Sequence, residues 1–125
     1  MITLRRGVVG KHRGVDVSAK SAEGMPKLLA PPWHLVMQAK RKQISWEIYR
    51  QRYLLCLNHV DALVVLPSLQ EGAAGGTLWL LCYCQLESEH CHVEVLIDYL
   101  VAVLPDFFKR EDCGGVMPDL SFVEG

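Results

Sequence analysis

Several features are missing from this sequence, and each absence excludes a class of protein. No apolar run approaches the roughly 20 residues that a membrane-spanning helix needs. The first residues, MITLRRGVVGKHRG, lack the apolar core of a signal peptide. The five cysteines are an odd number and do not suggest a disulfide framework. We therefore expect a cytoplasmic protein without membrane contact, whose thiols are reduced, bind metal or take part in chemistry.

The composition is that of a folded globular chain. Half of the 125 residues are apolar and 22% are charged, close to the averages for soluble domains. A chain of this length forms one domain and buries about two-thirds of the surface that its unfolded state exposes. We expect a single hydrophobic core that needs no disulfide.

The charges are divided unevenly along the chain. Residues 1–52 carry eleven Lys and Arg against three acidic residues, and the remainder is strongly acidic. The two halves either fold together with their charges in solvent, or the basic half binds phosphate or nucleic acid. Nucleic-acid binding has little support, because the sequence has no aromatic-interleaved basic repeat and no zinc-finger spacing. The cluster Lys40-Arg41-Lys42 falls at the end of an expected helix, where basic side chains complement the helix dipole.

The first two-thirds of the chain alternates between short strands and helices. Strands are expected at residues 2–4 and 14–18, and a loop at residues 18–31. A helix begins at Pro32 or Trp33, and a second, amphipathic helix follows the N-cap residue Ser45. A third helix is expected from Asn58 to Leu66, ended by Pro67, although residues 64–66 also suit a strand.

The stretch from Thr77 to Leu104 gives the clearest structural pattern. Residues 77–84 are apolar on both faces, as in an interior strand of a parallel sheet. A capped helix follows, with Ser88 as N-cap and Glu89 in its first turn, and its apolar residues recur at helical spacing until Pro105. The predicted fold is therefore α/β, a single compact domain with a small, mostly parallel sheet flanked by helices. It spans residues 1–105, and residues 106–125 form a tail that is partly flexible or interface-forming.

Cysteines and histidines gather where this strand, its loop and the helix start meet. Backbone N–H groups at the helix start suit an anion, and ligands bind at the carboxyl ends of parallel strands. One interpretation is a catalytic or redox thiol, Cys84 or Cys91, with His90 or His92 as its base. Another is a zinc site made of soft ligands, and the third is simple packing. The zinc site would use Cys82, Cys84, Cys91 and His92; no other cofactor is expected.

These residues also resemble a known family. LLCYCQLESEHCHVEVLIDYL resembles the strand, loop and helix of the domain of unknown function 488 family, especially its short members from bacteria, archaea and phages. GVDVSAKS resembles the first strand of that family with its aspartate, and APPWHLVMQAKRKQISWEIYRQRYLLCL resembles two of its helices. The family has an arginine where this chain has Val93.

The resemblance implies a compact α/β domain with a polar site at the ends of its first and last strands. The residues implied as catalytic are Asp16, Cys84, Cys91 and His92, and those implied as substrate-binding are Lys20, Tyr49 and Tyr53. If the family's arginine holds a phosphate or carboxylate, this chain has either lost that contact or replaced it with a lysine or arginine from its first half.

Three functions follow from these patterns. The first is a small enzyme that acts on a nucleotide or another small anionic substrate. The second is a non-catalytic binding or inhibitor protein of a mobile element or phage, which sequesters a nucleotide or blocks a host protein. The third is a zinc-binding structural domain. A homodimer is possible, since dimers are common among soluble proteins, but no pattern in the sequence indicates the oligomeric state.

Overall fold

A computed structural model describes residues 1–83 and 91–110 of the chain. Four strands form one sheet in the order β2-β3-β1-β4, and each adjacent pair is parallel. The α/β fold and the parallel sheet expected from the sequence are thus confirmed. In chain order the elements are β1 (Ile2–Val8), β2 (Val15–Asp16), the 3-10 helix η1 (Met25–Leu29), α1 (Trp33–Lys40), α2 (Trp46–Asn58), α3 (Ala62–Gly72), β3 (Thr77–Cys82), α4 (His92–Val103) and β4 (Phe108–Arg110).

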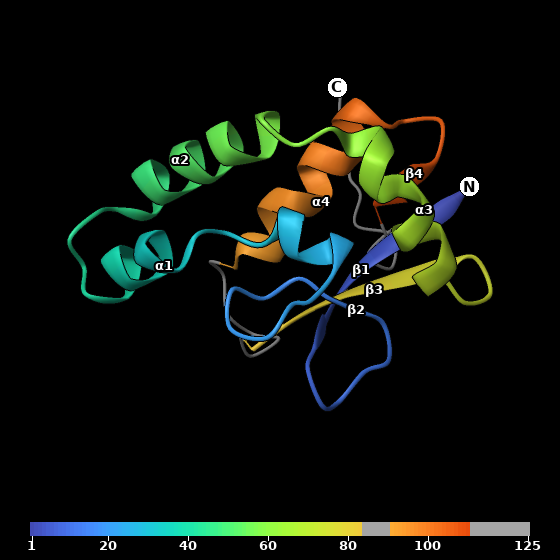
Figure 1. Ribbon diagram of the computed structural model, residues 1–125, viewed down its shortest axis with the longest axis horizontal. Helices are drawn as coiled ribbons and strands as arrows, with labels where there is room; N and C mark the ends of the chain where they lie inside the picture. The colour runs from blue at the N-terminus through green and yellow to red at the C-terminus, as the bar shows by residue number, and fades with distance from the viewer. Residues whose placement is uncertain (84–90, 111–125) are drawn as a thin grey trace, which may run out of the picture.

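The helices lie on one face of the sheet, and the strand order explains why. The connections from β2 to β3 and from β3 to β4 move across the sheet in the same direction, so right-handed crossovers place their helices on the same face. The connection from β1 to β2 moves in the opposite direction and therefore passes over the other face. Figure 1 shows this dark blue segment, residues 9–14, on the side of the strands away from the helices.

The segment between β1 and β2 packs closely against that second face. The ring of His12 stacks on Trp79, with centroids 4.4 Å apart, and its Nδ1 accepts a hydrogen bond from the Val8 amide. A Cβ atom at Gly14 would collide with the backbone of Trp79, so no other residue fits there without movement. The Arg5 guanidinium also lies over Trp79, 4.1 Å from the ring centroid. β3 is thus covered on both faces, by helices on one and by a loop on the other.

The core lies between the sheet and the helices. α4 is the central helix, because residues almost all round it are buried, as in a helix that contacts a sheet on one side and other helices on the other. Its apolar period from Val93 to Leu100 matches the helix expected from the sequence. Val93 is fully buried in this core.

Two helices differ from expectation at their ends. The structure corrects both expected ends of α3, whereas the expected cap of α4 lies outside the residues that the structure describes. α3 begins after Asp61, whose carboxylate accepts from the Leu63 amide, so the expected cap at Asn58 was wrong. Pro67 was expected to end this helix but lies inside it. The helix tolerates the lost hydrogen bond because Val65 and Leu69 anchor it in the core. α4 begins at His92, and the expected cap residues Ser88 and Glu89 lie outside the described residues.

The start of the expected tail adds an edge strand to the sheet. Residues 108–110 form β4, which pairs with the first residues of β1, and Phe108 is buried. Across residues 1–83 and 91–110, no single helix is long and apolar enough to cross a membrane. α2 and α3 taken together would pass by length and composition, although they are bent by 100° at their junction.

Candidate functional site

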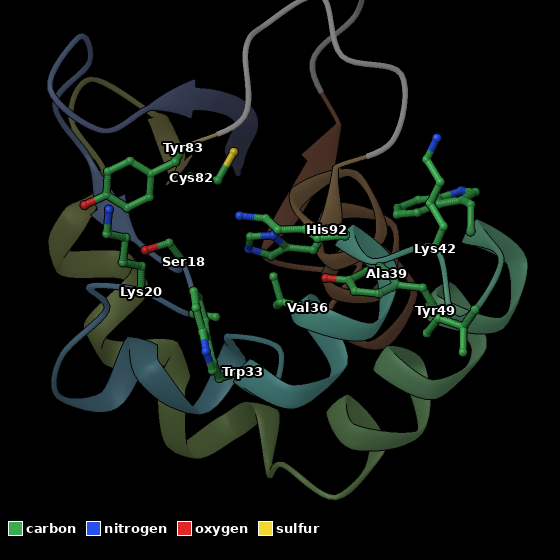
Figure 2. A pocket seen from close by; sticks show the side chains of 14 residues that line it. Ser18, Lys20, Trp33, Val36, Ala39, Lys42, Tyr49, Cys82, Tyr83 and His92 are labelled. Carbon is green, nitrogen blue, oxygen red and sulfur yellow. The ribbon is translucent and has the colours of Figure 1, made fainter.

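A cavity of about 650 Å³ opens at the carboxyl edge of the sheet, beneath the hairpin of α1 and α2. Its walls come from the segment after β2, the end of β3, the start of α4 and the two hairpin helices. Figure 2 shows Tyr83, Lys20 and Ser18 on one side, Lys42 and Tyr49 on the other, and His92 between them. The described lining residues are Ser18, Ala19, Lys20, Trp33, Val36, Ala39, Lys40, Lys42, Ile44, Trp46, Tyr49, Cys82, Tyr83 and His92.

Positive charges and aromatic rings dominate this wall. Lys20 lines it from the segment after β2, Lys40 and Lys42 line it from the end of α1 and the turn that follows, and no Asp or Glu is found among its described lining residues. The Lys40 ammonium lies 6.0 Å from the ring of Trp33, and the Lys20 ammonium lies 5.1 Å from the ring of Tyr83. Lys20 and Lys40 therefore each stand beside a flat π surface, an arrangement that suits an anion carrying a planar ring.

A hydrogen-bonded chain connects the cavity to Asp16. One carboxylate oxygen of Asp16 accepts from the Ser18 amide at 2.9 Å, and the other accepts from the Ser21 hydroxyl. Since Ser21 gives its only hydroxyl proton to Asp16, the Tyr83 hydroxyl 2.8 Å away must donate to the Ser21 oxygen. Asp16 does not line the cavity itself, but it orients Tyr83 through Ser21.

His92, the first residue of α4, is held in a defined orientation. Its Nε2 lies 3.0 Å from the carbonyl oxygen of Val17, and its ring makes an edge contact with Tyr53. A carbonyl oxygen only accepts, so Nε2 carries a proton, and in the neutral ring the lone pair lies on Nδ1. His92 therefore combines a fixed tautomer with a place in the cavity wall.

Two of the described cysteines contact each other. The Sγ atoms of Cys82, at the end of β3, and Cys91, the N-cap of α4, lie 3.1 Å apart, and both residues are buried. Cys82 lines the cavity, whereas Cys91 does not. Cys84, expected as a catalytic or zinc residue, and His90 lie outside the described residues. In the described part of the chain, no three His, Cys, Asp or Glu side chains converge on a position for a metal ion.

The two tyrosines expected to bind substrate have different surroundings. Tyr49 lines the cavity and stacks on Trp46, with ring centroids 5.3 Å apart. Tyr53 is fully buried one helical turn further on, and its hydroxyl donates to the carbonyl oxygen of Leu29. Burial, and after it the neighbouring Tyr49, raises the pKa of the Tyr53 hydroxyl well above its usual value of 10.0. Tyr53 is therefore a protonated core residue.

Sequence reasoning missed several residues of the cavity and the serine that connects one of them to Asp16. Ser21 and Tyr83 received no role, although an aspartate followed by serines two and five positions later is typical of a side chain that bonds its own turn. Lys40 and Lys42 were interpreted as dipole-complementing charges. Only the packing of α1 beside the ends of β2 and β3 shows that both line a cavity.

Comparison with protein families agrees with this architecture. The family described as the active DUF488-N3 subclade matches residues 3–103. The chain belongs to the DUF488 family. The match to DUF488 spans every described residue of the cavity wall, from Ser18 to His92, and Asp16 as well. No curated protein and no solved structure matches the chain.

Proposed function

We propose that this DUF488 protein is a small enzyme that acts on a nucleotide or a closely similar anion bound in the cavity. The observation that carries the proposal is the wall itself, where three lysines and several aromatic rings surround one space at the carboxyl edge of a parallel sheet. Open α/β sheets bind their ligands at this edge. The word "active" in the description of the matching subclade supports an enzyme rather than a purely structural domain.

The cavity has the size and charge for such a ligand. A volume of about 650 Å³ falls in the usual range for pockets that enclose small molecules. The phosphate would meet the lysine side chains, and the base would lie against an aromatic ring such as Trp46 or Trp33. All three lysines come from the basic first half of the chain. They supply the charge that the family's arginine would provide, because Val93 occupies its position and is buried.

Tyr83 is the group best placed to accept a proton from the substrate. Its own hydroxyl proton points to Ser21, so an oxygen lone pair remains to accept a hydrogen bond from a bound molecule. When a proton arrives on Tyr83, the tyrosine can pass its own proton to Ser21 and Ser21 can pass one to Asp16. The carboxylate then serves as the base without entering the cavity. Such proton transfer contributes about 10²–10⁴-fold to rate.

Lys42 has a backbone conformation that argues for a role of its side chain. Its φ is 58°, in the left-handed region that glycine occupies without strain. Among the described residues it is the only non-glycine with positive φ. Strain of this kind persists where a site requires the side chain, and here the lysine is one of the residues that line the cavity.

The test is calorimetric titration of the full chain with nucleoside mono-, di- and triphosphates, the parent nucleosides and inorganic phosphate. Lys40→Ala combined with Lys42→Ala should weaken nucleotide binding about tenfold or more, because each lysine gives a charge-assisted hydrogen bond. Arg41→Ala is the matched control, since Arg41 lies between the two lysines but outside the cavity wall. Equal affinities for the double variant and the control would exclude this site.

Turnover distinguishes the enzyme from a protein that only sequesters its ligand. Each nucleotide that binds is incubated with the protein and examined by chromatography and mass spectrometry. A product that forms with the wild type and not with Tyr83→Phe supports the enzyme. Tight binding without any product in the wild type contradicts it and favours sequestration.

A further inference from the structure

We propose that Cys82 and Cys91 form a two-electron oxidation site in which a hydroperoxide entering the cavity converts the thiol pair into a disulfide. The proposal stands independently of the nucleotide function, since it rests on the position of the two sulfur atoms. They lie 3.1 Å apart across the junction of β3 and α4. A disulfide bond measures about 2.05 Å, so closure requires a shift of about 1 Å.

The cavity gives one of the two thiols a route to solvent. Cys82 belongs to its wall, although only 1% of the residue's surface is exposed. Cys91 is equally buried and is not among the residues that line the cavity. A hydroperoxide that enters the cavity can therefore reach Cys82, whereas Cys91 is not part of the cavity wall.

The reaction balances with the hydroperoxide as the only oxidant. The Cys82 sulfur attacks the O–O bond, takes one oxygen to become a sulfenic acid, and releases an alcohol, or water when the oxidant is hydrogen peroxide. The Cys91 sulfur then attacks Cys82, the S–S bond forms, and the sulfenic oxygen leaves as water with the thiol proton. Two electrons pass from the sulfur pair to the peroxide. A dithiol reductant reverses the step.

The disulfide would tie two elements that both shape the cavity. Cys82 ends β3, and Cys91 is the N-cap residue directly before His92. The cross-link would close a short loop and restrict the unfolded chain, which stabilises the fold. It would also fix the start of α4, and with it the position of His92, relative to the strand.

The experiment oxidises the reduced full-length protein with an excess of hydrogen peroxide, alkylates it under denaturing conditions and maps the cysteines by mass spectrometry. Cleavage after Glu87 and Glu89 separates the peptide that holds Cys82 and Cys84 from the peptide that holds Cys91. The number of alkylated cysteines should fall from five to three, and the intact mass should fall by two hydrogens. The melting temperature should rise by about 5 °C.

Three variants identify the sulfurs involved. Cys84→Ser should still form the cross-linked peptide pair, whereas Cys82→Ser and Cys91→Ser should not. Cys56→Ser, which alters a cysteine on α2, is the matched control and should behave as the wild type. Loss of the cross-link in Cys84→Ser would overturn the assignment. Five alkylated cysteines after treatment, or addition of two oxygens to Cys82 in place of a disulfide, would overturn the proposal itself, even if a serine variant failed to fold.

Discussion

Two regions of the sheet carry basic side chains in different surroundings: the carboxyl ends of β2 and β3, which border the cavity, and the edge strand β4. At the edge where β2 and β3 end, Lys20, Lys40 and Lys42 surround a cavity that has no acidic residue among its described lining. At the other edge, the β4 residue Arg110 binds Glu94 of α4 at 2.7 Å and Asp98 at 2.6 Å. Hydrogen bonds to these two carboxylates raise the pKa of Arg110, although burial alone would lower it.

The difference shows how a structural polar cluster is distinguished from a binding site. Arg110 is matched by carboxylates from a neighbouring element, so its charge holds β4 against α4. The lysines at the cavity line a space that a ligand can fill, and no acidic residue is found among its described lining. Composition does not separate the two cases, since both consist of charged residues close to the sheet. What distinguishes a binding site from a structural ion pair is that its charged side chains line a cavity and are not paired with carboxylates.

The largest effect expected at the cavity edge is on catalysis. Tyr83→Phe should lower kcat for the nucleotide substrate by about 10²-fold or more, because it removes the oxygen that accepts the proton. The melting temperature should change little, since the Tyr83 side chain is largely exposed. Steady-state kinetics with the nucleotide that the wild type converts measure the change. An unchanged kcat would remove Tyr83 and Asp16 from the proposed proton path.

A second test contrasts Tyr83 with the buried Tyr53. Tyr53→Phe should destabilise the fold by about 2 kcal/mol, because the Leu29 carbonyl loses its buried donor. The pKa of Tyr53 is higher in the folded than in the unfolded protein, so its contribution to stability is complete below about pH 10 and declines as the pH rises further. Urea unfolding from pH 8 to 11 should therefore show a shallower alkaline decline in the variant.

Part of that decline should remain in the Tyr53→Phe protein. Burial, and after it the charge of Asp61, also raises the pKa of Tyr99, whose hydroxyl donates to the Leu57 carbonyl at 3.1 Å. The same sign applies, and Tyr99 also loses its contribution as the pH rises. Identical alkaline slopes for wild type and Tyr53→Phe would contradict the role given to Tyr53.

A change at Arg110, the ion-paired residue of β4, should alter the stability of the fold and leave nucleotide binding unaffected. Arg110→Ala should lower the free energy of unfolding by about 1 kcal/mol, since partly exposed ion pairs contribute modestly even when their geometry is good. Nucleotide affinity should stay the same. Lys109→Ala, a change at the exposed neighbour on β4, is the control and should leave both quantities unchanged. A loss of affinity in Arg110→Ala would erase the distinction between the two edges.

The smallest expected effect is at Lys42, where one substitution should change the stability of the fold and the affinity for nucleotide in opposite directions. Lys42→Gly should raise the free energy of unfolding by about 0.5 kcal/mol, because glycine adopts the positive φ without strain. The same change should weaken nucleotide binding, because a lysine leaves the cavity wall. Thermal unfolding and calorimetry measured on one preparation show both changes. A variant that gains stability and keeps full affinity would exclude Lys42 from the site.

Much of the fold could be predicted because its causes are local. Ser45 was identified as an N-cap, and its hydroxyl does accept from the Ile48 amide. The two-sided apolar strand at residues 77–82 required the interior of a parallel sheet, where it is found. The prediction that α3 ends before Pro67 was wrong, because packing of the helix in the core outweighed the low helix propensity of proline. β4 was missed because a three-residue edge strand has too few residues to show alternation.

The sequence by itself determined the α/β class, the family, the central helix with its apolar period, and the gathering of cysteines and His92 at one β-α junction. These properties depend on residues within one or two turns of each other. Tertiary structure alone decided which polar residues share the cavity, because Lys20, Lys42 and Tyr83 come from segments that only the crossovers bring together. It also brought Cys82 against Cys91 and left Tyr53 in the core, since the path of the backbone in space sets both contacts.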